Sequence, residues 1–190
     1  IAEQNFSHAE KLHVFIEELL QENNLTYKDL KAIAVSQGPG SYTGLRIGVS
    51  SAKGLCYALN IPLIAIDTLE SLARKITISD GIIISMIDAR RMEVYSAIFN
   101  VDYAKIRKVK AEIIDSNSYS HINETIHLVG DGISKFKDVL TEGKFVFHED
   151  ELYPSANEMS LLSFEKYKKS DFVDVAYFEP YYLKDFMLNK

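Results

Sequence analysis

The chain has 190 residues, of which 47% are hydrophobic and 25% are charged, so it can bury a core and is not largely disordered. Its formal net charge of −6 argues against a protein that binds nucleic acid through a broad basic face. A single cysteine, Cys56, excludes an internal disulfide, and no apolar run reaches the ~20 residues that span a bilayer. We therefore expect a soluble, cytoplasmic protein that makes no membrane contact.

The first part of the chain alternates helices with short apolar strands. Ser7 and Glu10 have the spacing of a capping box, and apolar residues then recur at helical spacing as far as Leu20. The segments predicted after this helix are a strand over 32–35, a helix over 44–59, a strand over 63–66 and a helix over 69–76. This order predicts an α/β lobe with parallel strands.

The pattern changes after a small polar stretch at 77–81, where several strands follow one another. Segments 82–87, 94–99 and 106–114 are predicted to form an antiparallel meander. The segments predicted beyond it are a strand over 126–129, a helix over 134–140, a strand over 144–147 and a helix over 155–168. We expect two lobes, residues 1–78 and residues 79–190.

A glycine-rich turn lies between a predicted strand and a predicted helix, in the sequence QGPGSYTGLRIG at 37–48. Such a turn can direct N–H groups at a phosphate. The candidate phosphate or nucleotide residues are Gly38, Gly40, Ser41, Thr43 and Gly44. The spacing is one residue longer than the dinucleotide fingerprint, and the Gly-Lys-Ser/Thr of a P-loop is missing. The alternative is a tight turn in which Ser41 or Thr43 caps the helix.

Small residues recur four apart on the helix after this turn, at Gly44, Gly48 and Ala52, with Ser51 beside them. An interior glycine costs ~1 kcal/mol relative to alanine, so close approach of another element is needed to offset it. That element is either the sheet or the first helix of the same lobe, or a helix of a partner subunit. The spacing does not separate these two interpretations.

A candidate cleft is formed by polar residues at two predicted strand ends, namely Asp88, Arg90, Glu93, Gly130, Asp131 and Gly132. The carboxylates Asp88 and Glu93 can perform acid–base chemistry or hold a metal, and the turn at 130–132 can contact a phosphate or adenosine. The alternative is that they hydrogen-bond the turn backbone. The histidines have no zinc-binding spacing, and we predict no metal site.

Residues 34–48, AVSQGPGSYTGLRIG, resemble the signature of the TsaB (YeaZ-type) family. The resemblance extends over nearly the whole chain through SHAE at 7–10, IDAR at 87–90, EVY at 93–95 and EPYYL at 179–183. It implies a two-lobed, actin-like (ASKHA, RNase H-like) α/β fold, whose first lobe is expected to have a strand hairpin before Ile1. It also implies a part in making N6-threonylcarbamoyladenosine (t6A) at position 37 of tRNA.

The family is a paralogue of the catalytic subunit TsaD, formerly called an M22 glycoprotease. Catalytic relatives carry an H-x-x-x-H metal pair, and the matching positions here hold Thr68 and Leu72, which cannot replace two imidazoles. The resemblance therefore implies a non-catalytic scaffold or activator without a required cofactor. The competing hypothesis is an actin-fold ATPase or acyl transferase that binds nucleotide at Gly38–Gly44.

The resemblance also implies the partners of the chain. These are TsaD as a heterodimer, TsaE through TsaD, a second copy of the chain when TsaD is absent, and tRNA only through the complex. Weak ATP or ADP binding within that complex is compatible with the resemblance. The predicted partner interface consists of His8, Leu12, Phe15, Leu19, Gly44, Leu45, Gly48, Ser51, Ala52 and Leu55.

Overall fold

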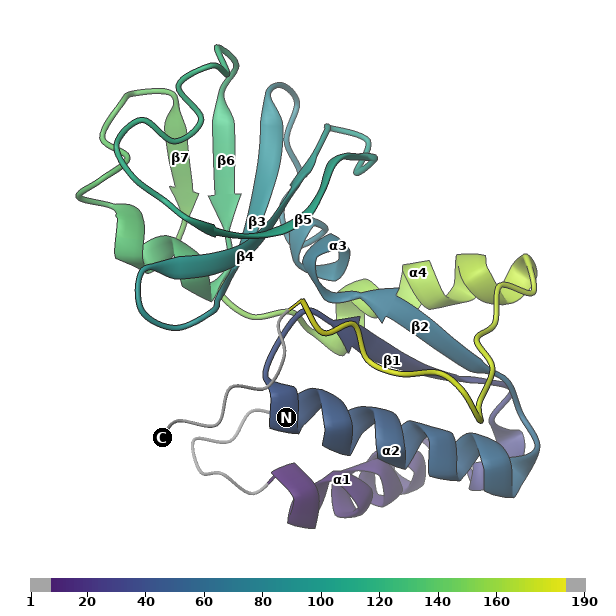
Figure 1. Ribbon diagram of the computed structural model, residues 1–190. Coiled ribbons are helices and arrows are strands. Elements are labelled where there is room, and N and C mark those ends of the chain that lie inside the picture. The colour runs from purple at the N-terminus through teal and green to yellow at the C-terminus, as the bar shows by residue number, and fades with distance from the viewer. Residues whose placement is uncertain (1–7, 184–190) are drawn as a thin grey trace, which may run out of the picture.

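The computed structural model describes residues 8–183, with side chains from Lys11 onward (Figure 1). Its elements in chain order are α1 (His8–Glu22), η1 (Tyr27–Asp29), β1 (Ile33–Gly38), α2 (Tyr42–Leu59), β2 (Leu63–Asp67), α3 (Thr68–Ala73), β3 (Ile82–Asp88), β4 (Glu93–Phe99), β5 (Lys105–Ile113), β6 (Ile126–Val129), η2 (Asp131–Phe136), β7 (Phe145–His148) and α4 (Ala156–Lys168). The predicted capping box involves Ser7, which lies outside the described residues. Within the described range, no helix has the length and apolar content needed to cross a membrane.

One predicted helix is wrong in type, because residues 134–140 do not form an α-helix. The structure has the short 3-10 helix η2 in this region, beginning directly after Gly130. Gly130 has no side chain to cap the first amides, and helices of this tighter kind occur in short pieces. The other predicted strands and helices of the described range are confirmed, with shifts at their ends.

The first sheet consists of β1 and β2, which pair in parallel from Ile33 opposite Leu63 onward. On one face, Ala52 and Cys56 of α2 pack against Leu63 in a small buried cluster. On the other face α4 contacts β2 (Figure 1). Cover on both faces explains why β2 is a continuous apolar run rather than an alternating one.

The second sheet has the order β5-β4-β3-β6-β7. Strand β3 pairs antiparallel with β4 and parallel with β6, so the predicted meander β3-β4-β5 is confirmed. Alternate residues of β3 face different clusters: Ile82, Ile84 and Met86 face one large core, whereas Ile83 faces the cluster built on α3. Both faces of this central strand are therefore buried.

The chain returns to the first sheet after residue 155. Val173 pairs with Leu63, and the N–H of Tyr181 donates to the carbonyl oxygen of Gln37 at 2.7 Å. The last described segment, yellow in Figure 1, runs beside β1 and α2. The lobe boundary at residue 78 stays a prediction, but residues 156–183 pack on the first sheet rather than extending the second one. Sequence order does not say which sheet a helix covers, which is why α4 was assigned to the second lobe.

Candidate functional site

A cavity of about 310 Å³ lies between the glycine-rich turn, α3 and the second sheet. It is lined by Val35, Ser36, Pro39, Gly40, Ser41, Gly44, Leu45, Gly48, Thr68, Ile87, Asp131, Tyr153 and Pro154. Residues that are far apart in the sequence therefore meet here. Among the candidate phosphate residues, Gly40, Ser41 and Gly44 reach the cavity, whereas Gly38 and Thr43 do not line it.

The glycine-rich turn is held tightly by its own neighbours. Ser41 is the N-cap of α2, and its Oγ accepts a hydrogen bond from the N–H of Gly44 at 3.3 Å, as the capping alternative predicted. Gly38 has φ +109, and a Cβ there would lie 2.8 Å from the carbonyl oxygen of Tyr181. This position requires glycine because the last described segment of the chain lies directly against it.

The two positions that match the metal pair of the catalytic relatives hold side chains with other contacts. Thr68 is buried, and its Oγ1 accepts a hydrogen bond from the N–H of Gly38 at 3.1 Å. Leu72 is fully buried beside Gly130 in the core cluster of α3. In the part of the chain that the structure describes, no three His, Cys, Asp or Glu residues are grouped so as to hold a metal.

Replacing Thr68 with valine is expected to lower the free energy of unfolding by about 1–2 kcal/mol, because the buried Gly38 amide loses its acceptor while the shape of the side chain is kept. Urea unfolding measures this difference. The matched control is Thr68→Ser, which keeps the hydroxyl that accepts from the Gly38 N–H and is expected to retain most of the native stability. Equal stability of Thr68→Val and the native protein would show that the amide has another acceptor.

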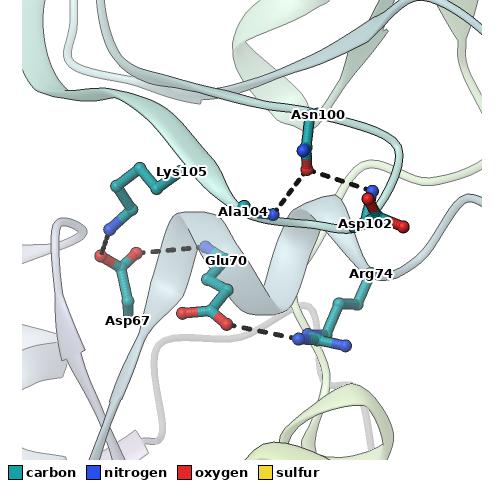
Figure 2. Close-up of polar contacts among 7 residues, drawn as sticks. All are labelled: Asp67, Glu70, Arg74, Asn100, Asp102, Ala104 and Lys105. Atoms are coloured by element: carbon teal, nitrogen blue, oxygen red, sulfur yellow. Dashed lines mark hydrogen bonds and ion pairs between the residues drawn. The ribbon is translucent and has the colours of Figure 1, made fainter.

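Asp67 lies directly before α3, and both oxygens of its carboxylate make polar contacts. Oδ1 accepts hydrogen bonds from the N–H groups of Leu69 at 2.8 Å and Glu70 at 3.1 Å, and so caps the helix. Oδ2 forms an ion pair with Lys105 of β5 (Figure 2). The Asp67 carboxylate therefore stabilises the structure where the two sheets meet, by capping α3 and pairing with β5.

The predicted cleft residues at the end of β3 form a turn network. The N–H of Arg90 donates to Asp88 Oδ1 at 2.6 Å, and the same carboxylate pairs with Lys135. The N–H of Asp88 donates to Asp131 Oδ1 at 3.0 Å, which brings the two predicted turns together. Gly132 is packed tightly, since a Cβ there would lie 2.8 Å from Val94 Cγ1.

Of this cleft set, Asp131 alone lines the cavity. Burial raises the pKa of the Asp131 carboxyl above its ordinary value; the Asp88 N–H opposes the rise, and the Asp88 charge adds to it. Asp88, Arg90, Glu93, Gly130 and Gly132 support the turns around the cavity without lining it. The structural alternative for these residues describes their observed contacts well.

The predicted interface residues divide into outward and inward groups. On α1, Leu19 is 59% exposed and Leu12 and Phe15 are half-buried, while the side chain of His8 lies outside the described part of the structure. On α2, Ser51 and Leu55 are half-buried.

The small-residue stripe of α2 faces its own sheet. Leu45 and Ala52 are buried within the chain itself, and their part in a partner interface stays a prediction. Gly44 and Gly48 line the cavity, and a Cβ at Gly48 would lie 3.8 Å from Val35 of β1. Of the two interpretations that the spacing left open, close packing on the sheet is the one that these contacts fit.

Sequence reasoning missed the residues that close the cavity from the far part of the chain. Tyr153 and Pro154 precede α4 and line the cavity together with Ile87 at the end of β3. No local pattern marks them, because their position depends on the return of the chain to the first sheet.

Comparison with known proteins gives the same family as the motifs. The family model described as "TsaD: tRNA N6-adenosine threonylcarbamoyltransferase" matches residues 2–177. The Escherichia coli protein named "tRNA threonylcarbamoyladenosine biosynthesis protein TsaB" is 29% identical, covering 94% of this chain and 81% of that protein. The Bacillus subtilis protein of the same name is 38% identical over 54% of this chain and 45% of that protein.

The fold has a close counterpart among solved structures. YeaZ from Pseudomonas aeruginosa superposes with a TM-score of 0.77 at 23% sequence identity, covering 93% of this chain and 84% of that one. This likeness confirms the predicted actin-like α/β fold. Because the family match spans nearly the whole chain and the named relatives are TsaB proteins, the chain belongs to the TsaD family and, within it, to the TsaB/YeaZ-type proteins.

Proposed function

We propose that this protein acts in the biosynthesis of N6-threonylcarbamoyladenosine in tRNA as a non-catalytic subunit that binds TsaD. The observation that carries the proposal is the state of the two positions matching the catalytic metal pair. The Thr68 hydroxyl accepts a hydrogen bond from the Gly38 N–H, and Leu72 is buried in the core. Neither side chain is therefore available to hold a metal.

The cavity gives a second line of support, because its charge does not suit a nucleotide. Among the described residues that line it, Asp131 is the charged one, and no lysine or arginine is present. Polyphosphate sites normally gather cationic side chains or free helix-terminal amides. The ATP-dependent enzyme is therefore the less favoured hypothesis, and we propose that the chain requires no cofactor.

Helix α1 supplies a surface for the partner. It packs on α2, and Leu20 is the one side chain buried among those described on this helix. Leu19 is 59% exposed, and Leu12 and Phe15, which lie seven and four residues before it on the same face of the helix, are half-buried. We propose that this side of α1 contacts TsaD, pairs with a second copy when TsaD is absent, and leaves contact with TsaE and tRNA to the complex.

Reconstitution of threonylcarbamoyl transfer with purified TsaD and TsaE tests the proposal. With tRNA, ATP and an activated threonylcarbamoyl donor present in every mixture, adding the full-length protein to TsaD and TsaE is expected to increase transfer to tRNA. The same mixture without TsaD is expected to give no transfer. Transfer in the absence of TsaD would support the competing enzyme hypothesis. No increase in the presence of TsaD and TsaE would contradict the activator role.

Replacing Leu19 with lysine is expected to weaken binding to TsaD by about 10- to 100-fold, the value of burying one leucine at an interface. Titration calorimetry measures the affinity, and transfer should fall in parallel at limiting protein. The control is Tyr177→Lys, because Tyr177 is 85% exposed and lies outside α1. If both variants bind TsaD as tightly as the native protein, α1 is not the contact surface.

A further inference from the structure

We propose that the cavity beside the glycine-rich turn binds a small ligand with an apolar body and one positively charged amine, and that Asp131 receives the amine. This inference goes beyond the scaffold function and does not rest on it. It assigns to the non-catalytic subunit a ligand site of its own, with a chemistry opposite to that of a phosphate site.

The walls of the cavity favour an apolar ligand body. Val35, Leu45 and Ile87 reach it from three different elements, and Tyr153 and Pro154 line it from the segment before α4. Its volume of about 310 Å³ is at the lower end of the range for small-molecule sites, ~300–1,000 Å³. The cavity therefore suits a ligand with a single ring rather than a nucleotide.

The polar groups of the cavity decide the charge of the ligand. The hydroxyl oxygens of Ser41 and Thr68 already accept hydrogen bonds from the N–H groups of Gly44 and Gly38, so these two amides are not free to hold an anion. Asp131 is the charged residue among the described lining side chains. An anionic ligand would meet this carboxylate, whereas Lys135, whose charge acts on Asp131, pairs with Asp88 and does not line the cavity.

A hydrogen bond holds the Asp131 carboxylate in place, and this carboxylate can accept another hydrogen bond from a ligand amine. The N–H of Asp88 fixes the carboxylate through Oδ1 at 3.0 Å. Burial disfavours its charged form and raises its pKa, so an amine placed beside it would offset that cost. A hydrogen bond between an amine and a carboxylate is stronger than one between neutral groups.

The test compares two probes that share a phenyl ring and differ in charge. 2-Phenylethylamine and phenyl phosphate are titrated into the full-length protein at pH 7.5, and binding is followed by amide chemical shifts in NMR spectra and by thermal stability. We expect the amine to bind and to shift the amides of the glycine-rich turn. Phenyl phosphate is expected to cause no saturable shift there.

Two variants locate the site. Asp131→Asn keeps an acceptor for the Asp88 N–H but removes the charge, and it is expected to weaken amine binding by about tenfold. Gly48→Leu places a side chain into the cavity, where a Cβ meets nothing closer than 3.8 Å, and is expected to abolish binding without touching Asp131. Gly54→Leu is the control on the same helix, because a Cβ at Gly54 meets no atom within 4 Å and Gly54 does not line the cavity.

Three results would overturn the inference. The first is tighter binding of phenyl phosphate than of the amine, which would make the cavity an anion site. The second is unchanged amine binding by Asp131→Asn and Gly48→Leu, which would locate the amine elsewhere. The third is the absence of any saturable shift with the amine in the native protein. Because none of these measurements involves TsaD, failure here leaves the scaffold proposal untouched.

Discussion

Replacing Gly130 with alanine is expected to lower the free energy of unfolding by about 3–5 kcal/mol, from backbone strain and overpacking together. Gly130 has φ 111 and ψ 168, a region of backbone conformation that residues with a Cβ rarely adopt. A Cβ there would collide with the carbonyl oxygen of Met86 and would lie 2.6 Å from Leu72 Cδ2. Met86 and Leu72 are fully buried, so neither can move aside cheaply.

Urea unfolding at neutral pH measures this loss, with the midpoint expected to fall and the dependence on urea to stay constant. Gly54→Ala in α2 is the matched control, since a Cβ there meets no atom within 4 Å. That change is expected to raise the free energy of unfolding by up to about 1 kcal/mol through helix propensity. Equal midpoints for Gly130→Ala and the native protein would mean that the turn after β6 relaxes readily.

The second large effect is expected at Arg107, which is central to a polar network inside the second sheet. Its Nη1 donates to Glu112 Oε2 at 2.9 Å and its Nη2 donates to Ser96 Oγ at 2.6 Å. The hydroxyl of Tyr119 donates to Glu112 Oε1 at 2.7 Å. Arg107→Met keeps the bulk of the side chain but leaves the partly buried Glu112 carboxylate without its cation, which is expected to cost about 2–3 kcal/mol.

The cost of Arg107→Met is expected to depend on pH. Burial alone would raise the pKa of Glu112, but hydrogen bonds from Arg107, Ser96 and Tyr119 together hold it below its ordinary value. A carboxyl whose pKa is lower in the folded state stabilises the protein above its unfolded pKa, and this contribution is lost as the pH falls through the folded pKa. The deficit of the variant should therefore be full at pH 7 and should shrink below about pH 4.

Unfolding by urea at a series of pH values from 7 to 3 measures this convergence. The control is Lys137→Met, which breaks an exposed ion pair with Glu149 and is expected to change stability by less than about 1 kcal/mol throughout. A deficit for Arg107→Met that stays constant down to pH 3 would show that lost packing, rather than the orphaned carboxylate, causes it.

The elements with a strong local pattern were predictable from sequence. Each of these patterns follows from a local physical requirement of its element. The patterns are the apolar spacing of α1, the capping residue Ser41 of α2 and the continuous apolar run of β2. The glycine-rich turn was located for the same reason, because Gly38 adopts a backbone conformation that favours glycine.

The candidate site was only partly predictable, because it depends on contacts between distant segments. Asp131 was singled out, but its meeting with Thr68 and Tyr153 follows from the way the two sheets face each other. The small-residue stripe of α2 had two physical interpretations that give the same spacing. Only the position of Val35 beneath Gly48 distinguishes them.

The two contacts of the Asp67 carboxylate affect how the two sheets can move relative to each other. One oxygen holds the first turn of α3 and the other holds Lys105 on the edge of the second sheet (Figure 2). Rotation of one sheet against the other must either carry α3 along or separate Lys105 from Asp67. A single carboxylate therefore links the orientation of a helix to the position of a strand hairpin.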